Sequence, residues 1–340
     1  MLKTLMHRRE RWFYQRDQNR IVRPFEWGMP FVTDHVNGDE PIEFFRRFSE
    51  QVMQNSKDFY SLPEIDDYEL NADDLSWTSA VQTSSPKNNR AHARFFPAKT
   101  RNGKQSRKAV VVLPQWNAQR DSHVEACKIF NLLGISALRL TLPYHDDRRP
   151  PELERADYMV GTNIGRTIQS FRQAVLDTRA AVRWLSSEGF ESLGILGTSV
   201  GSCIAFLTFA HEPALNAGAF NHVSGYVADV AWHGLSTQHV RAGFADHITL
   251  EELRNCWLPI SPLPFMPQVA SMTPRPMRFI VAKYDLTFPV DLSHAAIAEA
   301  RRYKLPLDVV WLPCGHYTTG EMPWKAIDAW KIATFFRKEL

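Results

Sequence analysis

Short apolar runs alternate with longer amphipathic stretches over most of this 340-residue chain. The runs 109–113 and 193–196 contain only apolar residues and glycine, which is typical of strands buried on both faces of a parallel sheet. Between them, residues 167–187 have apolar positions at helical spacing and predict a long amphipathic helix. The pattern therefore predicts an α/β protein with a mostly parallel sheet and helices on both of its faces.

The same pattern predicts eight strands. Two alternating runs, 77–82 and 91–98, flank a segment rich in Ser, Pro and Asn, and they predict an antiparallel start to the sheet. The other six strands are predicted at 109–113, 135–142, 193–196 and 222–231, and in the runs that begin at Met277 and Leu307.

Two segments fall outside this alternation. Residues 1–74 are rich in Arg and aromatic residues, and an apolar stripe over 41–55 predicts a helix there, so we expect an N-terminal helical extension before the main domain at 75–340. Glu10 interrupts its arginines, which favours a solvated face over an oligomer contact or a membrane anchor. Residues 233–276 contain many prolines and no clear strand, and they predict a lid insertion.

Candidate chemistry lies directly after one predicted strand. Residues 197–201 read Gly-Thr-Ser-Val-Gly, a G-x-S-x-G pattern between the strand 193–196 and a small, apolar helix. In a nucleophile elbow, such a turn pushes the hydroxyl of its serine, here Ser199, out above the sheet, and glycines flank it because a Cβ would strike neighbouring backbone. The helix N-terminus behind the turn offers free N–H groups to an anion.

Two later strands each end near a residue that could work with this serine. Asp285 follows the strand that begins at Met277, and His316 follows the strand that begins at Leu307. The order Ser, Asp, His differs from that of chymotrypsin-like and subtilisin-like proteases. Asp229, at the end of the predicted strand 222–231, is an alternative acid, whereas Asp291 is expected to cap a helix.

These segments resemble a known family. GTSVG, AKYDLTFP and LPCGH are similar to the nucleophile elbow, acid loop and histidine loop of the α/β-hydrolase superfamily, over residues 75–340. The chain also loosely resembles an uncharacterised group of α/β-hydrolase-domain-containing proteins. The resemblance implies the α/β-hydrolase fold and a carboxylesterase-like serine hydrolase without a cofactor, in which Ser199 is the nucleophile, His316 the base and Asp285 the orienting acid. A small-molecule ester or thioester is the expected substrate.

The resemblance also implies an oxyanion hole. Val200 is expected to supply one N–H and the loop after strand 109–113 the other, which by alignment falls at Trp116. Pro114-Gln115 replaces the His-Gly usual in the family, so either Gln115 or Trp116 is the donor, and Asn117 could add a side-chain N–H.

Four residues are expected to line the substrate pocket: Gln115, Tyr144, His145 and Trp232. Trp257, Phe265 and Met266 of the lid are expected to add apolar lining. His145 stands beside two aspartates but lacks a second histidine at ligand spacing, so no metal is expected.

The composition of the chain limits which classes of binding partner are expected. Basic and acidic residues number 40 and 37, for a net charge of only +3, so nucleic acid is not an expected partner. No run approaches the roughly 18 to 20 apolar residues of a membrane span, the N-terminus is too polar for a secretory signal, and a cytoplasmic protein is expected. The four scattered cysteines are expected to be free thiols.

Three alternatives remain open from the residues alone: a peptidase or lipase on the same fold, or a catalytically inactive binding or scaffold protein. The complete Ser, Asp and His set favours an enzyme, and the missing His-Gly favours the inactive protein. The oligomeric state is undetermined by the sequence.

Overall fold

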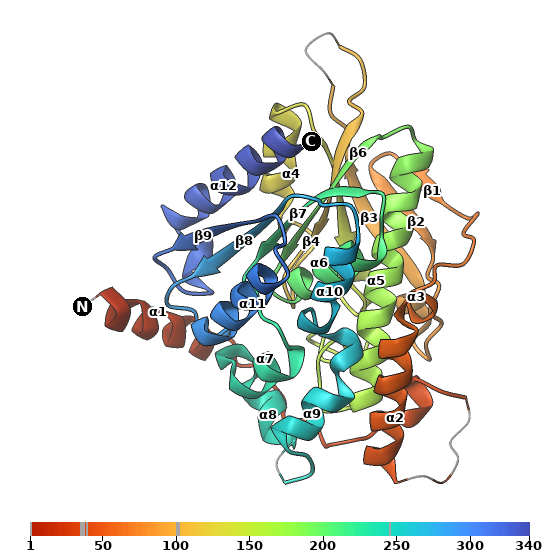
Figure 1. The fold of residues 1–340 in the computed structure, drawn as a ribbon, viewed down its shortest axis with the longest axis vertical. Coiled ribbons are helices and arrows are strands. Elements are labelled where there is room, and N and C mark those ends of the chain that lie inside the picture. The colour runs from red at the N-terminus through yellow and green to blue at the C-terminus, as the bar shows by residue number, and fades with distance from the viewer. Residues whose placement is uncertain (1, 35–37, 39, 100–102, 245) are drawn as a thin grey trace.

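An open, nine-stranded sheet forms the centre of the protein (Figure 1). The computed structural model describes residues 2–34, 38, 40–99, 103–244 and 246–340. In spatial order the strands are β1 (Glu69–Asn71), β2 (Asp74–Thr78), β3 (Arg90–Phe96), β5 (Ser136–Thr141), β4 (Lys108–Leu113), β6 (Ser192–Thr198), β7 (Leu215–Asn221), β8 (Met277–Ala282) and β9 (Leu307–Leu312). The pairs from β1 to β5 are antiparallel, and those from β5 to β9 are parallel.

Two sequence predictions about the sheet are wrong. The sheet has nine strands and not eight, because β1 adds a short edge strand whose three residues are all exposed and so carry no apolar signal. The strand predicted at 222–231 does not exist; β7 occupies Leu215–Asn221, and Val227–His233 forms the helix α7. The small residues of β7 hid its strand, while valines and alanines at 227–231 imitated one.

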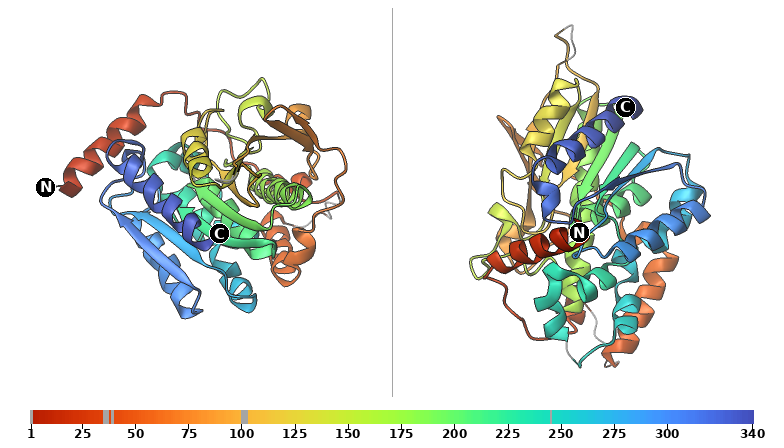
Figure 2. Two further views of the ribbon diagram at one scale, coloured as in Figure 1. Left: turned by 90° about the horizontal axis from the view of Figure 1, so that it is seen from above. Right: turned by 90° about the vertical axis from the view of Figure 1, so that its left-hand side faces the viewer.

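Helices cover both faces of the sheet (Figures 1 and 2). The helices α5 (Ile164–Ser187), α6 (Val200–His211) and α11 (Val290–Arg302) pack in the larger apolar core, and α4 (Val124–Leu132) and α12 (Trp324–Glu339) pack in the smaller one. Successive residues of β4 point into different cores, Val111 into the larger and Val110 and Val112 into the smaller. A strand buried on both faces must therefore be apolar throughout, as the sequence pattern indicated.

Among the described residues of 1–74 there are three α-helices, α1 (Leu2–Arg16), α2 (Pro41–Gln54) and α3 (Ser56–Phe59), and the last of these residues enter the sheet as β1 and the start of β2. The buried face of α2 packs on the segment that includes α9 (Leu250–Cys256), where Ser49 Oγ donates to the Cys256 carbonyl at 2.9 Å. Close by, Tyr60 Oη donates to the Pro259 carbonyl at 2.8 Å. Most of α1 is exposed, including Arg8, Arg11 and Arg16, as the sequence suggested, but Glu10 within it is fully buried.

The segment 233–276 is helical and contains no strand among its described residues. It includes α8 (Gln238–Phe244), α9 and α10 (Met266–Ser271), with α9 begun by a capping box between Thr249 and Glu252. In Figure 1, α8 and α9 lie below the sheet together with α7, whereas α10 lies beside α6. Among the described residues, we find no helix that combines the length and the apolar character required to cross a membrane.

The strand order reverses beside β4. β5 pairs with β4 on one side and β6 on the other, and the intervening helices α4 and α5 cross on opposite faces. Such a reversal opens a crevice beyond the carboxyl ends of the strands, where open α/β sheets bind ligands. Ser199 directly follows β6 at this edge.

Candidate active site

The turn between β6 and α6 holds Ser199 in a strained backbone conformation. Its φ is 58° and its ψ is −123°, a combination that residues with a Cβ rarely adopt. A Cβ on Gly197 would lie 2.1 Å from the Gly201 oxygen, and a Cβ on Gly201 would lie 2.5 Å from the Pro114 oxygen, so both positions require glycine. The Ser199 N–H donates to the Asn221 carbonyl at 2.8 Å, which ties the turn to the end of β7. This is the strand, turn and helix geometry that a nucleophile elbow requires.

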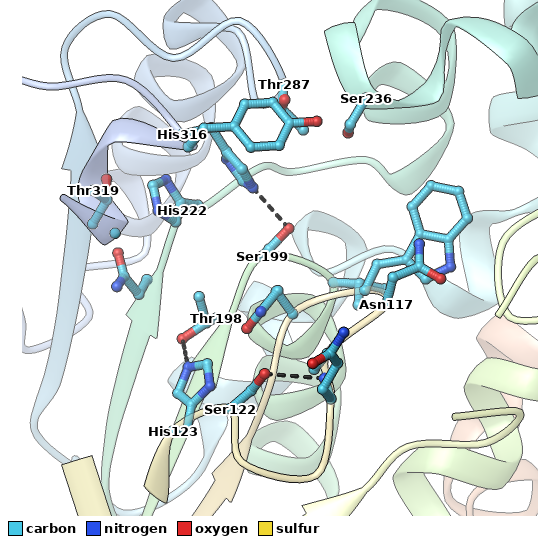
Figure 3. Close-up of a pocket in the computed structure, with 18 of the residues that line it drawn as sticks. Asn117, Ser122, His123, Thr198, Ser199, His222, Ser236, Thr287, His316 and Thr319 are labelled. Carbon is cyan, nitrogen blue, oxygen red and sulfur yellow. Dashed lines mark hydrogen bonds between the residues drawn. The ribbon is translucent and has the colours of Figure 1, made fainter. Parts of the chain in front are cut away.

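Ser199, His316 and Asp285 form a hydrogen-bonded chain. His316 Nε2 lies 3.1 Å from Ser199 Oγ (Figure 3), and His316 Nδ1 lies 2.9 Å from Asp285 Oδ2. If Nδ1 carries the proton and donates it to the carboxylate, Nε2 is free to accept the hydroxyl proton of Ser199. The three side chains come from the loops after β6, β8 and β9, which end at the same edge of the sheet.

The environment of Asp285 keeps its carboxylate ionised. Burial alone would raise its pKa, but the charge on His316 and the hydrogen bonds of two histidines lower the pKa well below its usual range. Its other oxygen, Oδ1, accepts the backbone N–H groups of Thr287 and Phe288 at 2.8 and 2.7 Å. Every lone-pair direction of the buried carboxylate is thus directed at a donor.

The pKa of His316 is shifted in the opposite direction. Its burial lowers its pKa, whereas the charge and hydrogen bond of Asp285, together with the charge of Glu10, raise the pKa above the ordinary value for histidine. The ring also stacks on Phe288, with the ring centroids 5.3 Å apart and 14° between the planes. A base held in one orientation and made more basic by a carboxylate suits proton transfer from a hydroxyl.

A second histidine, His222, was not predicted from the sequence and contacts the same carboxylate. Its Nδ1 lies 2.9 Å from Asp285 Oδ2, so the rings of His222 and His316 share one carboxylate oxygen. Burial and the charge of His316 lower the pKa of His222, which therefore donates from a neutral ring. His222 follows β7 directly and has a positive φ of 61°. Its position after a strand was the available signal, and the wrong strand assignment at 222–231 concealed it.

The loop after β4 lies on the side of Ser199 opposite to His316 (Figure 3). The Asn117 N–H donates to His145 Nε2 at 2.9 Å, and Asn117 Oδ1 accepts the Ala156 N–H at 2.8 Å. The Trp116 indole N–H donates to the Ala156 carbonyl at 2.9 Å. The main-chain N–H of Asn117 is therefore occupied, which leaves those of Gln115 and Trp116 as the candidates for binding an anion. Val200 is the first residue of α6, so its N–H has no carbonyl partner within the helix.

Ser199 lines a cavity of about 1310 Å³. Of the predicted pocket residues, Gln115, Tyr144 and His145 are among those that line it. His145 is nonetheless buried, with Nδ1 2.8 Å from the Pro143 carbonyl and Nε2 bound to the Asn117 N–H, so both ring nitrogens hold the loop. Burial lowers its pKa to about 4, which keeps the ring neutral.

Trp232 and the lid residues have different surroundings. The Trp232 ring stacks on Phe244, with centroids 6.2 Å apart, and is not among the described residues that line the cavity. Trp257, Phe265 and Met266, predicted as apolar lining, are buried in the larger core instead. The turn after α7, at Ser236 and Thr237, supplies this side of the cavity wall.

Comparison with known proteins identifies the fold. No family model and no curated protein matches the chain. Among solved structures, an acylaminoacyl peptidase from Pyrococcus horikoshii matches with a TM-score of 0.59 and 12% identity, over 84% of this chain and 44% of that one. Acetyl xylan esterase 1 from Thermoanaerobacterium sp. JW/SL YS485 matches with a TM-score of 0.58 and 14% identity, over 88% and 99%. An esterase from Pyrococcus furiosus matches with a TM-score of 0.54 and 14% identity, over 94% and 98%. The chain has the α/β-hydrolase fold. It spans less than half of the matched peptidase chain, and at these identities the likeness concerns the fold alone.

In this α/β-hydrolase fold the alternative acid, Asp229, has another partner. Asp229 sits on α7, where its Oδ1 accepts a hydrogen bond from Arg254 Nε at 2.8 Å. Asp291 is exposed in the first turn of α11. It is not the helix cap that we expected, because the N-cap of α11 is Pro289 and no side chain caps it. Asp285 is therefore the acid that contacts His316 in this fold.

One group of side chains in the described part of this α/β-hydrolase chain has the composition of a metal site. The ligand atoms of His222, Asp285 and His316 lie within 4.8 Å of one another. Both Nδ1 atoms are at hydrogen-bond distance from the same carboxylate oxygen, so these atoms are already used in pairing with one another.

Proposed function

We propose that this chain is a serine hydrolase that cleaves a carboxylic ester or thioester through an acyl-enzyme. The observation that carries the proposal is the hydrogen-bonded chain from Ser199 through His316 to Asp285, at the strained turn after β6. Esterases among the proteins of similar fold support ester hydrolysis at the level of the fold.

The proposed reaction has two halves. Ser199 Oγ attacks the substrate carbonyl carbon while its proton passes to His316 Nε2, and Asp285 holds the resulting imidazolium. The tetrahedral intermediate then breaks the bond to the alcohol or thiol, which leaves with the proton from His316. In the second half, a water molecule gives a proton to His316 as it attacks the acyl-enzyme. The second tetrahedral intermediate then breaks the bond to Ser199 Oγ, which takes the proton back from His316 as the acid is released.

The oxyanion of each tetrahedral intermediate needs hydrogen-bond donors. We assign these to the main-chain N–H groups of Val200 and Trp116, because Val200 opens α6 and the neighbouring Asn117 N–H is occupied by His145. Gln115 is the alternative second donor. Donors held by a rigid backbone require no reorganisation as the charge develops, and each is worth about 10²- to 10³-fold in turnover.

In this proposal, residues 75–340 form the catalytic domain, residues 233–276 its lid and residues 1–74 an extension. The chain's own side chains supply every proton transfer described above.

Covalent labelling with a fluorophosphonate probe tests the proposal. We expect the wild-type protein to be labelled and Ser199→Ala to be unlabelled, because the probe reacts with an activated serine. Ser236→Ala is the matched control, since its hydroxyl lines the same cavity and its loss should leave labelling intact. A folded wild-type protein that is not labelled, or a Ser199→Ala variant that is, would contradict the proposal and favour an inactive binding protein.

A substrate panel separates the remaining reaction types. p-Nitrophenyl esters of short and long acyl chains, a thioester and an N-acyl amino-acid amide would be compared at equal concentration. Turnover of short esters and thioesters, lost in Ser199→Ala, is the expected outcome. Faster cleavage of the amide would indicate a peptidase, and turnover of long-chain esters alone would indicate a lipase.

A further inference from the structure

The helix α1 buries one residue, and that residue is charged. Of its described residues 2–16, Glu10 is the buried one, and it has no exposed surface. A buried carboxylate is costly unless donors satisfy it. Apolar residues of the same helix, such as Leu5 and Trp12, remain 59% and 41% exposed. Apolar packing alone therefore does not explain how α1 docks.

The carboxylate of Glu10 binds the loop that carries His316. Its Oε2 accepts the Tyr317 N–H at 3.0 Å, and its Oε1 accepts the Thr318 N–H at 2.9 Å. These are the two amides that follow His316 directly. On the other side of His316, a Cβ on Gly315 would lie 2.4 Å from Glu10 Cδ, so the carboxylate packs tightly against the glycine backbone.

Other contacts hold α1 against the loops that carry His316 and Asp285, and Figure 2 shows α1, in red, beside the blue C-terminal part of the chain. Arg9 Nε pairs with Glu321 at 3.2 Å, and the Phe13 ring stacks on Tyr317, with centroids 6.0 Å apart and 17° between the planes. His7 meets the ring of Tyr284, which precedes Asp285, with the centroids 6.4 Å apart. Glu10 lies between these anchors on the same helix.

We propose that Glu10 is a positioning residue of the active site, which fixes the His316 loop through its two main-chain hydrogen bonds and places a negative charge beside the imidazolium formed during catalysis. The inference rests on the proposed function. Glu10 lies more than three hundred residues before His316 in the chain. The proposal therefore gives the N-terminal extension a direct role in the activity of the hydrolase.

The charges around His316 define the expected electrostatics. Asp285 and His222 face it from the loops after β8 and β7, and Glu10 faces it from α1. The Tyr317 ring lies 6.0 Å from the His316 ring between centroids, and its phenol oxygen accepts a hydrogen bond from Arg20 Nη2 at 3.2 Å. Among these groups, Asp285 and Glu10 raise the pKa of His316. The pKa of Glu10 itself is raised, because its burial and the charge of Asp285 outweigh its two backbone hydrogen bonds and the charge of His316, which lower it.

The test is Glu10→Gln, with Arg8→Gln as the matched control. Glutamine keeps the shape but loses the charge, and its NH₂ group faces one of the two amide donors. The base acts when neutral, so activity falls as the pH drops below the pKa of His316. Glu10→Gln should move this acid limb of kcat/KM to lower pH, and it should reduce kcat about ten- to a hundredfold through misplacement of the ring. Arg8→Gln, an exposed change on the same helix, should alter neither.

Glu10→Asp separates the two effects and covers the case in which Glu10→Gln does not fold. It retains the charge but falls one methylene short, so kcat should drop while the acid limb stays closer to the wild-type position than in Glu10→Gln. A wild-type pH profile and kcat in both folded variants, or in Glu10→Asp alone where Glu10→Gln does not fold, would overturn the proposal.

An NMR titration of the His316 ring distinguishes failure of this proposal from failure of the proposed function. If the wild-type protein hydrolyses no ester but the pKa of His316 falls in Glu10→Gln, the coupling between the two residues stands and the function is wrong. If activity depends on Ser199 and the pKa of His316 is unchanged in Glu10→Gln, the charge role of Glu10 is wrong.

Discussion

Nδ1 of His222 lies 2.9 Å from Oδ2 of Asp285. His222 donates a hydrogen bond to the same oxygen that accepts from His316. It therefore weakens the interaction between Asp285 and His316, while it fixes the position of the carboxylate. His222→Phe keeps a ring of similar size and removes the donor. We expect kcat to fall about tenfold or more, because Asp285 is less firmly oriented. The acid limb of kcat/KM should move to higher pH, opposite to the shift in Glu10→Gln, because the whole charge of Oδ2 then faces His316. His222→Gln can still donate a hydrogen bond, so its acid limb and kcat should lie between those of the wild type and His222→Phe. An acid limb at lower pH in His222→Phe would refute this account.

The two candidate acids should respond differently to neutralisation. Asp285→Asn should lower kcat by about 10⁴-fold, the loss typical when the orienting acid of such a triad is replaced by its amide. Asp229→Asn removes the negative charge that pairs with Arg254, whose side chain is 41% exposed, so it should cost some stability and little turnover. Steady-state kinetics with thermal melts of both variants decide the matter. A larger loss of kcat in Asp229→Asn would reassign the acid.

The elbow should not tolerate a side chain at Gly201. An added Cβ would lie 2.5 Å from the Pro114 oxygen and 2.6 Å from the Leu113 oxygen, both of them backbone atoms that cannot turn away. Gly201→Ala should therefore destabilise the fold by about 1–3 kcal/mol and displace Ser199, with a loss of activity greater than the loss of folded protein. Gly320→Ala is the control, because a Cβ there meets nothing within 4 Å. Chemical denaturation and kcat measurements on both variants would show whether the strain resides at the elbow.

His145 should act on turnover through the loop after β4. His145→Phe removes the acceptor of the Asn117 N–H and leaves that group without a partner, so the neighbouring main-chain donors shift. We expect kcat to fall about tenfold or more while KM changes little, since the affected contacts form in the transition state. His294→Phe, at an exposed position on α11, serves as the control. A rise in KM with unchanged kcat would instead place His145 in ground-state substrate binding.

Asp328 should make stability depend on pH. Burial raises its pKa to about 7, against a hydrogen bond from Asn221 that lowers it, and its Oδ1 is buried without a partner. Between about pH 4 and 7 the folded state therefore holds a proton that the unfolded state has released, and the free energy of unfolding falls as the pH rises through this range. Asp328→Asn should remove this decline and be more stable than wild type at pH 8, with little difference at pH 4. Denaturation at both pH values measures it, and a variant less stable at pH 8 would contradict the assignment.

Much of the fold follows from local patterns. The buried strands β4 and β6 and the long helix α5 have apolar spacings typical of their element types, and the structure contains all three near their predicted positions. The strand β7 was not predicted because its central residues, Ala217, Gly218 and Ala219, have small side chains that give little apolar contrast. The strand β1 was not predicted because an exposed edge strand needs no apolar face.

By itself, the sequence determined the α/β class, the turn at Ser199, and the positions of Asp285 and His316 just past strand ends, because each depends on residues close together in the chain. Only the tertiary structure decided which polar groups meet. His222 joins Asp285 across the ends of two neighbouring strands, Asn117 is held by His145, and Glu10 reaches the His316 loop from the opposite end of the chain. A buried carboxylate has the same sequence signature as a solvated one. Its role depends on which backbone amides the fold brings to it, and that is settled by packing at long range.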